Sequence, residues 1–175
     1  MAHVVLRLGD DVSTDVIYPG RYMATVLPSE TAQFAFADHP DFNARLKAKD
    51  IPPGSVIVGG SNFGCGSSRE QAVSCLTGHQ LTVVARSFSR IFLQNAVNLG
   101  LRLITVPGIE ASVGDEIAVE EHVVLNRTTR EAYPVVALPE SRRAIVEAGG
   151  LIPYTRKRLL APVSRPPAAL DRMAH

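Results

Sequence analysis

Three short runs of apolar residues in the middle of the chain restrict its fold more than any other feature. They cover residues 55–58, 81–85 and 101–106. Runs of this length with little alternation are typical of strands that are buried on both faces. Segments with helical spacing lie between them, at 69–76 and 88–99. This order of strands and helices, with short connections, predicts right-handed parallel crossovers and therefore an α/β fold.

Weaker patterns extend this βαβαβ centre in both directions. Gly100 is expected to cap the helix at 88–99, because glycine readily takes the left-handed conformation found at helix ends. The other expected elements are a strand at 4–8, a turn-rich acidic loop at 9–15, helices at 28–37, 42–49 and 139–148, and short antiparallel strands at 116–119 and 122–125.

The chain of 175 residues is of the size of one domain. We expect that domain to cover residues 1–160. Residues 161–175 contain several Pro and Ala residues and little periodicity, so they are expected to form a flexible C-terminal tail.

Composition limits the partners and the compartment. Eighteen Lys and Arg residues stand against seventeen Asp and Glu residues, which gives no reason to expect nucleic acid or an anionic membrane as a partner. The start of the chain lacks the pattern of a signal peptide, and no apolar stretch approaches the roughly 20 residues that span a bilayer. The sequence therefore predicts a soluble, cytoplasmic protein.

Cysteine and histidine are too few for a metal centre of this chain's own. An iron–sulfur cluster takes three or four thiolates and a structural zinc site takes four ligands, whereas this chain has two cysteines and five scattered histidines. We expect no metal on this chain, so any metal chemistry would need another chain. Cys65 is interpreted as a small packing residue, Cys75 as a core residue and His79 as a surface residue.

The segment 60–70 carries the strongest chemical signal. It is a glycine-rich loop between a predicted strand and a predicted helix, and Asn62, Gly64 and Gly66 would let its backbone approach a ligand closely. The N-terminus of a helix favours anions. Arg69 adds a guanidinium that can grip a carboxylate at two points. The loop is therefore expected to bind a carboxylate.

Two serines beside this arginine suggest a base. A serine alkoxide is basic enough to remove a proton next to a carboxylate, if nearby N–H donors and a guanidinium stabilise it. Spacing alone does not separate Ser67 from Ser68. A dinucleotide fingerprint is disfavoured because Arg69 occupies the place of its third glycine, and no Gly-Lys-Ser or Gly-Lys-Thr follows for a phosphate loop. A purely structural turn, capped by either serine, remains open.

The run Asn62-Phe63-Gly64-Cys65-Gly66-Ser67-Ser68-Arg69-Glu70 resembles the small subunits of 3-isopropylmalate dehydratase and homoaconitase, which are equivalent to the swivel domain of aconitase. The resemblance covers nearly the whole domain, from about residue 6 to residue 159. Further matching blocks occur in order at 9–22, 87–92, 95–101, 138–140 and 147–154.

This resemblance implies an aconitase-type swivelling β/β/α domain and a division of labour between two chains. A large partner subunit would hold a [4Fe-4S] cluster, and this chain would close over the site. By position, Ser67 corresponds to the catalytic base, Ser68 to a substrate-contacting serine and Arg69 to the carboxylate-binding arginine. Asp15 corresponds to an aspartate that assists a histidine of the large subunit. A role for Asp15 as a turn cap is the alternative.

The same resemblance points to a hydroxy-dicarboxylate as the substrate. Residues that follow Gly20-Arg21 contact the substrate side chain in this family, and here they are Tyr22, Met23, Ala24 and Thr25. No charge is offered there, which favours 3-isopropylmalate, isomerised to 2-isopropylmalate in leucine biosynthesis, over a tricarboxylate. The chain departs from the usual pattern after the serines, where Gln71 and Val73 replace a histidine and a proline.

Other functions are also compatible with the sequence. The chain could belong to a homoaconitase or to another alkylmalate dehydratase, which would use the same residues. It could instead be a non-catalytic module that binds a small carboxylate, or a paralogue kept for assembly or regulation. The presence together of Asp15, Ser67, Ser68 and Arg69 favours an enzyme subunit, because a binding module has no need of the base.

Overall fold

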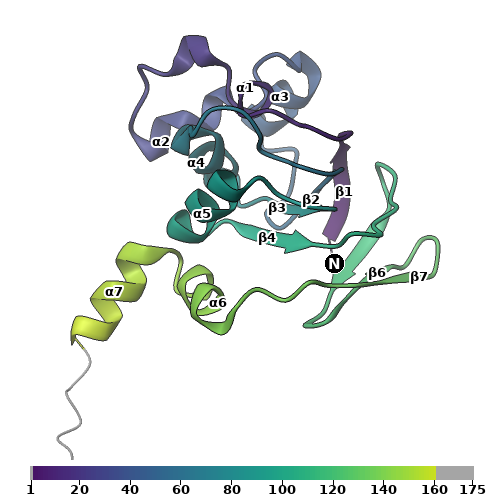
Figure 1. The fold of residues 1–175 in the computed structure, drawn as a ribbon. Helices are drawn as coiled ribbons and strands as arrows, with labels where there is room; N and C mark the ends of the chain where they lie inside the picture. Colours follow the sequence, from purple (N-terminus) through teal and green to yellow (C-terminus); the bar gives the residue numbers. More distant parts are fainter. Residues whose placement is uncertain (1, 161–175) are drawn as a thin grey trace, which may run out of the picture.

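The computed structural model describes residues 2–160 of the chain. A seven-stranded mixed sheet has the order β4-β3-β2-β1-β5-β6-β7. Helices α1 to α5 gather on one side of the parallel strands, and the β6–β7 hairpin lies on the other side (Figure 1). This arrangement confirms the expected α/β class, with a parallel centre and added antiparallel strands.

The parallel half contains the predicted βαβαβ unit. Strands β2, β3 and β4 pair in parallel without interruption, and β1 joins β2 in parallel with an irregularity between Val4 and Leu6. Gly100 ends α5 with φ 72°, as predicted for a left-handed cap. The elements are β1 (Ala2–Arg7), β2 (Val56–Gly59), α4 (Glu70–Gly78), β3 (Thr82–Ala85), α5 (Arg90–Leu99) and β4 (Arg102–Thr105).

Alternation along the parallel strands divides the core into two layers. Val56 and Val58 of β2 face the layer under the antiparallel hairpins, while Ile57 faces the helices. The same alternation places Ile104 in the first layer and Leu103 in the second. Successive side chains of a strand point to opposite faces, so a strand packed on both faces must be apolar throughout. This explains the three apolar runs in the sequence.

The antiparallel half curls back towards β4. Strand β5 (Glu116–Val119) pairs with β1 and β6 (Val123–Asn126), and β7 (Glu131–Pro134) pairs with β6. The sequence did not predict β7, which is exposed and contains few apolar residues. Beyond β7, the N–H of Val136 donates to the carbonyl of Thr105 at 2.9 Å. That single bridge joins the two edges of the sheet at one point.

The segment between β1 and β2 is more broken than predicted. The predicted loop at 9–15 ends in a helical turn, α1 (Thr14–Ile17), capped by Ser13. The predicted helix at 28–37 is instead a short helix, α2 (Pro28–Thr31), followed by the 3₁₀ turn η2 (Ala32–Phe34). Phe36 has a positive φ of 52°, so the helical stretch ends before it. A 3₁₀ turn η1 (Gly20–Tyr22) and helix α3 (Pro40–Lys47) complete the segment.

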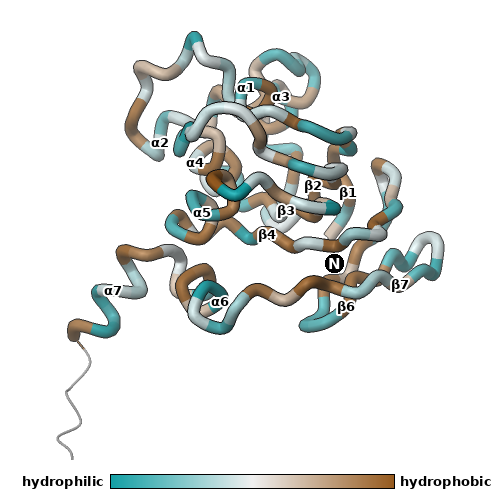
Figure 2. The backbone as a smooth tube through the Cα atoms, viewed as in Figure 1, coloured by the Kyte–Doolittle hydropathy of each residue, from teal (hydrophilic) through white to brown (hydrophobic). Residues whose placement is uncertain are grey.

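Two helices end the described chain. Helix α6 (Glu140–Glu147) matches the predicted helix at 139–148, although Pro139 is its N-cap rather than its first helical residue. Helix α7 (Leu151–Leu160) was not predicted, and it projects from the body of the domain (Figure 1). Figure 2 shows hydrophobic residues at its two ends and hydrophilic ones between them. The expected tail at 161–175 lies outside the described residues.

Between residues 2 and 160 the helices are too short and too polar for any of them to cross a bilayer.

Candidate active site

Two loops that are far apart in sequence form the candidate site. The loop 60–69 leaves the carboxyl end of β2, and the loop 9–15 leaves the carboxyl end of neighbouring β1. The N–H of Gly64 donates to the carbonyl of Val12 at 2.7 Å, and the N–H of Thr14 donates to the carbonyl of Cys65 at 2.8 Å. Adjacent parallel strands deliver their loops to one edge of a sheet, a common position for ligand sites.

The glycines of the first loop have defined roles. Gly64 has φ 79°, and a Cβ there would lie 2.1 Å from Cγ of Phe92, so only glycine fits between the loop and α5. Gly66 has φ 91°, and a Cβ there would meet Thr14 Oγ1 only at an ordinary contact distance of 3.5 Å. Asn62 also has a positive φ of 57°, and its side-chain amide donates to Asp11 Oδ1 at 2.8 Å. These three residues shape the turn that carries the serines.

The serines do not cap the following helix. Helix α4 begins at Glu70 with Arg69 at its N-cap, and no side chain accepts a hydrogen bond from its first turn. The alternative of a turn capped by Ser67 or Ser68 is therefore wrong, and the predicted helix start at 69 is one residue early. Both serines are exposed. Neither serine hydroxyl therefore caps the start of α4, and both serines lie at the surface.

Arg69 is held by the other loop. Its guanidinium donates to the carboxylate of Asp15 and, at 3.2 Å, to the carbonyl of Tyr18. The Arg69 side chain is 16% exposed, whereas that of Asp15 is 57% exposed. Asp15 is not a turn cap, because Ser13 caps α1. A Cβ on Gly20 would lie 3.2 Å from the guanidinium, so Gly20 leaves room for this ion pair.

Thr14 supports Ser67 from beneath, and this contact was missed by reasoning from the sequence. Its side chain is 1% exposed. Its hydroxyl donates to the Ser67 carbonyl at 3.1 Å, and the two hydroxyl oxygens are 3.4 Å apart. Because the Thr14 proton is directed at the carbonyl, the Thr14 oxygen can accept the Ser67 proton. Only the pairing of the loops reveals this contact, although Thr14 precedes Asp15 in the matching block.

A cavity of about 440 Å³ opens over these residues. Three of the four predicted substrate-contacting positions after Gly20-Arg21 do not contribute to it, since Tyr22, Ala24 and Thr25 are absent from its lining. Gln71, which departs from the usual family pattern, is part of the cavity lining. The residues that line the cavity are Gly20, Met23, Ser67, Ser68, Arg69, Glu70 and Gln71.

Aromatic packing accounts for the absence of Tyr22 from the cavity lining. Its ring stacks on Phe34, with centroids 4.1 Å apart, and Tyr18 donates its hydroxyl proton to the Tyr22 carbonyl at 3.0 Å. Burial raises the pKa of the Tyr18 phenol. Arg21 lies over the outer face of Tyr22 and pairs with Asp38, which lowers the pKa of that carboxyl group. These contacts hold in place the turn from which Met23 reaches the cavity.

The remaining polar candidates have structural contacts. The Cys65 thiol donates to the Asp11 carbonyl at 3.3 Å. Cys75 is fully buried, as expected for a core residue, and burial raises the pKa of its thiol. His79 is half-buried rather than exposed, and its ring Nε2 lies 2.8 Å from the Ala32 carbonyl. Val73 is fully buried in the core against which α4 packs.

Residues 2–160 bring no three Cys, His, Asp or Glu side chains together as a metal site would. Cys65 and Cys75 are both free thiols, one half-buried and one buried. The donor set in this part of the chain does not fit an iron–sulfur cluster, which needs several converging thiolates.

Comparison with known proteins gives consistent relatives. Residues 22–108 match the family model described as the aconitase C-terminal domain. The 3-isopropylmalate dehydratase small subunit of Methanosarcina mazei is 44% identical, over 86% of this chain and 93% of that protein. The isopropylmalate/citramalate isomerase small subunit of Methanocaldococcus jannaschii is 46% identical, over 89% of this chain and 93% of that protein.

A solved structure agrees with these relatives. The crystal structure of a 3-isopropylmalate dehydratase from Methanocaldococcus jannaschii superimposes with a TM-score of 0.81 at 37% identity, covering 90% of this chain and 94% of that one. Fold, loop motif and near-complete coverage thus agree with the sequence-based resemblance. The chain belongs to the aconitase family of hydro-lyases, among the 3-isopropylmalate dehydratase small subunits.

Proposed function

We propose that this chain is the small subunit of a heteromeric hydro-lyase that converts 3-isopropylmalate into 2-isopropylmalate. The observation that carries the proposal is the placement of Ser67, Ser68, Arg69 and Met23 around one cavity, beside Asp15. A base, a carboxylate-binding group and an apolar side chain would then face the same substrate molecule in this cavity. These are the three features that a branched hydroxy-dicarboxylate requires.

Ser67 would act as the base. As an alkoxide it takes the proton from the branched carbon next to a carboxylate, while the hydroxyl on the neighbouring carbon departs and a double bond forms between the two carbons. Returning the proton to the second carbon and hydroxyl to the branched one gives the isomer. Thr14 would favour the alkoxide, because its hydroxyl, now 3.4 Å from that of Ser67, can rotate to donate to it.

Arg69 and Ser68 would hold a substrate carboxylate. A guanidinium binds a carboxylate through two parallel hydrogen bonds, which fixes orientation as well as position. The buried side of Arg69 is anchored by the Tyr18 carbonyl, so its planar group is already oriented. The substrate carboxylate must then compete with the carboxylate of Asp15, unless Asp15 moves to another partner when the active site is assembled.

The site is expected to be completed by a large subunit. The lack of a convergent thiolate set between residues 2 and 160 supports placing the [4Fe-4S] cluster on that partner. Such a cluster would supply a Lewis acid for the departing hydroxyl. The exposed carboxylate of Asp15 would face a histidine of the partner. The partner would also close the cavity, which excludes water and strengthens electrostatic contacts.

Met23 supports a substrate with an apolar branch. It is the one residue of the 22–25 turn that lines the cavity. A second candidate, a smaller alkylmalate, is favoured by the relative whose name includes citramalate isomerase. A tricarboxylate is disfavoured because the turn offers the cavity no positive charge. We also propose that the chain acts as one domain of a cytoplasmic protein.

The test is anaerobic co-expression with a candidate large subunit, followed by ultraviolet detection of the alkene formed from 3-isopropylmalate. The wild-type complex should be active, and each subunit alone should be inactive. Ser67→Ala should lower kcat by at least about 10²-fold, because a positioned base contributes roughly that much. The alkylmalate alternative is tested by assaying citramalate and homocitrate under the same conditions.

Ser61→Ala is the matched control. Ser61 lies exposed in the same loop but outside the cavity lining, so its loss should leave kcat unchanged. Full activity of the Ser67→Ala complex would refute the proposed base. Turnover by this chain without a partner would refute the two-subunit arrangement.

A further inference from the structure

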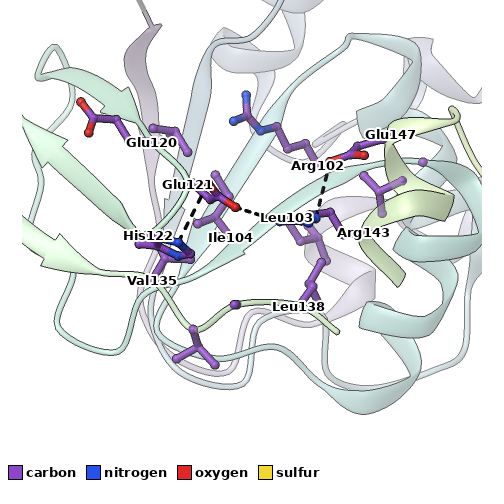
Figure 3. Close-up of a pocket in the computed structure, with 15 residues that line it drawn as sticks. Arg102, Leu103, Ile104, Glu120, Glu121, His122, Val135, Leu138, Arg143 and Glu147 are labelled. Carbon is purple, nitrogen blue, oxygen red and sulfur yellow. Dashed lines mark hydrogen bonds and ion pairs between the residues drawn. The ribbon is translucent and has the colours of Figure 1, made fainter. Parts of the chain in front are cut away.

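A second and larger cavity, of about 720 Å³, lies away from the serine loop. It occupies the opening between the edge strand β4, the end of the β5–β6 hairpin and helix α6 (Figure 3). It shares no lining residue with the candidate active site. Cavities of about 300–1,000 Å³ are typical of sites for small molecules.

The edge of β4 is only partly paired at this cavity. Val106 donates its N–H to β3, and the Thr105 carbonyl accepts from Val136 on the opposite side. Backbone groups of a parallel strand alternate in direction, so Leu103, like Thr105, turns its N–H and carbonyl away from β3. No hydrogen bond to these two groups of Leu103 exists among residues 2–160. Leu103 therefore offers one donor and one acceptor side by side.

Arg102 supplies a positive charge beside them. Its side chain lies on the same face of β4 as Ile104, because residues two apart in a strand share a face. It is exposed, and within the described part of the chain it has neither an ion pair nor a hydrogen bond. Arg143, by contrast, is already bound at 3.1 Å to Glu121 and at 3.7 Å to Glu147. Arg102 is the cation of this cavity that is free to bind an anion.

Carboxylates make the rest of the polar lining negative. Glu121 and Arg143 face each other across the cavity, and the chain of contacts continues to Glu147 and His122 (Figure 3). Glu120 makes no ion pair among the described residues. Two guanidinium groups against three carboxylates give the lining a net charge of −1 with His122 neutral. A dianion such as the hydroxy-dicarboxylate substrate is therefore disfavoured here.

The remaining lining is aliphatic. Ile104 lies in the core layer under the hairpins, and Val119 and Val135 pack partly buried against the same layer. Val136 is 55% exposed. A ligand of this cavity must therefore have an aliphatic part. It must also have an anionic group for Arg102 and the Leu103 N–H, and a cationic donor for the Leu103 carbonyl and Glu120.

We propose that this cavity binds a free aliphatic α-amino acid. Its carboxylate would accept from the Arg102 guanidinium and the Leu103 N–H, and its ammonium group would donate to the Leu103 carbonyl. The exposed side chain of Glu120 points away from Leu103 in Figure 3 and would turn towards the ammonium group when the ligand binds. Its side chain would lie against Ile104, Val119 and Val135. The ligand would thus complete the edge of β4 and connect it to the β5–β6 hairpin. This proposal goes beyond the catalytic function and does not depend on it.

Isothermal titration calorimetry of the isolated full chain with L-leucine tests the proposal without reference to activity. Saturable binding with a Kd in the micromolar to millimolar range is expected. D-leucine, 4-methylpentanoate and 3-methylbutylamine should each bind at least about tenfold more weakly, because each misplaces or lacks one of the charged groups. Absence of saturable heat up to about 10 mM L-leucine would overturn the proposal.

Arg102→Gln and Glu120→Gln locate the site. Each should weaken L-leucine binding at least about tenfold, through loss of a charge-assisted hydrogen bond. Arg45→Gln, an exposed arginine on α3, is the control and should bind as the wild type does. Circular dichroism shows whether each variant is folded. Because Arg102→Gln and Glu120→Gln are independent substitutions, the test still stands if one of the two variants does not fold. Wild-type affinity for L-leucine in both Arg102→Gln and Glu120→Gln would contradict the assignment. Binding of 4-methylpentanoate as tight as that of L-leucine would contradict it as well.

Discussion

Asp15 and Arg69, 54 residues apart in sequence, form an ion pair beside the cavity that Ser67 and Ser68 line. The arginine is mostly buried and also anchored to a backbone carbonyl, whereas the aspartate is mostly exposed. The arginine is thus fixed and the aspartate is free to change partners. This asymmetry supports our proposal that the Asp15 carboxylate leaves Arg69 and pairs with the large subunit when the complex assembles.

Asp15→Asn should separate binding from catalysis in the assembled complex. We expect kcat to fall by about 10²-fold, because a group that assists proton transfer contributes at least that much. KM should stay equal or fall, since Arg69 is then released for the substrate carboxylate. Steady-state kinetics on 3-isopropylmalate measures both. The exposed Asp50 provides the control, because Asp50→Asn should change neither constant. A raised KM with unchanged kcat would assign Asp15 to binding alone.

Thr14 is expected to position and stabilise the Ser67 alkoxide. Thr14→Val removes the hydroxyl but keeps the shape of the side chain. It should lower kcat about 10-fold or more, because that factor corresponds to the free energy of one hydrogen bond to a charged group. The acid limb of the kcat–pH profile should also move to higher pH, because Ser67 ionises less readily. Thr14→Ser should restore both. An unchanged pH profile would leave Thr14 with a packing role only.

Met23 should determine the preference for the branched substituent. Met23→Ala should lower kcat/KM for 3-isopropylmalate about tenfold, since the loss of apolar contacts in a pocket costs roughly 1–3 kcal/mol. The effect should be smaller for a substrate with a methyl branch. Ala24→Ser, at the next residue but outside the cavity, is the control. Equal losses for both substrates would indicate that another residue contacts the branch.

Gly64 and Gly54 provide a matched pair for the packing of the serine loop. Both have positive φ, 79° and 82°, but a Cβ on Gly64 meets Phe92 at 2.1 Å whereas one on Gly54 meets nothing within 4 Å. Gly54→Ala should cost about 1–2 kcal/mol from the backbone conformation alone. Gly64→Ala should cost about 1–3 kcal/mol more, from overpacking. Urea unfolding measures the two free energies, and equal values would contradict the contact.

Asp115 should contribute to the acid sensitivity of the fold. The Ser112 N–H and the Asn126 amide donate to its carboxylate at 2.8 and 2.7 Å, which lowers its pKa below the usual 3.8. The unfolded chain therefore takes up this proton first as the pH falls. The contribution of Asp115 is present above about pH 4 and is lost as the pH falls through the lowered pKa.

Urea unfolding between pH 7 and pH 3 measures this contribution. Asp115→Asn should be less stable at pH 7 by about 1.5–3 kcal/mol, the range for a hydrogen bond to a charged group, and should lose less stability on acidification. Asp50→Asn should keep the wild-type slope, because Asp50 is exposed. A slope unchanged by Asp115→Asn would refute the assignment.

The sequence by itself determined the parallel centre of the fold. Strands buried on both faces must be apolar throughout, so β2, β3 and β4 could be recognised from local composition, and Gly100 marked the end of α5. Elements without such a signature were missed. Strand β7 is mostly exposed and lacks an apolar pattern, so its pairing with β6 rather than its composition makes it a strand. Helix α7 was missed because it follows two glycines, which predict the end of a helix.

For the candidate site, the sequence predicted which residues would carry the chemistry, and the tertiary structure decided how those residues meet. The motif around Ser67 and Arg69 is continuous, so it could be recognised along the chain. The contacts of Thr14 with Ser67 and of Asp15 with Arg69 arise only when two parallel strands bring their loops together. The stacking of Tyr22 on Phe34 could likewise not be predicted from the sequence. Tertiary packing decided these positions, because the face that a loop side chain presents depends on neighbours that are remote in sequence.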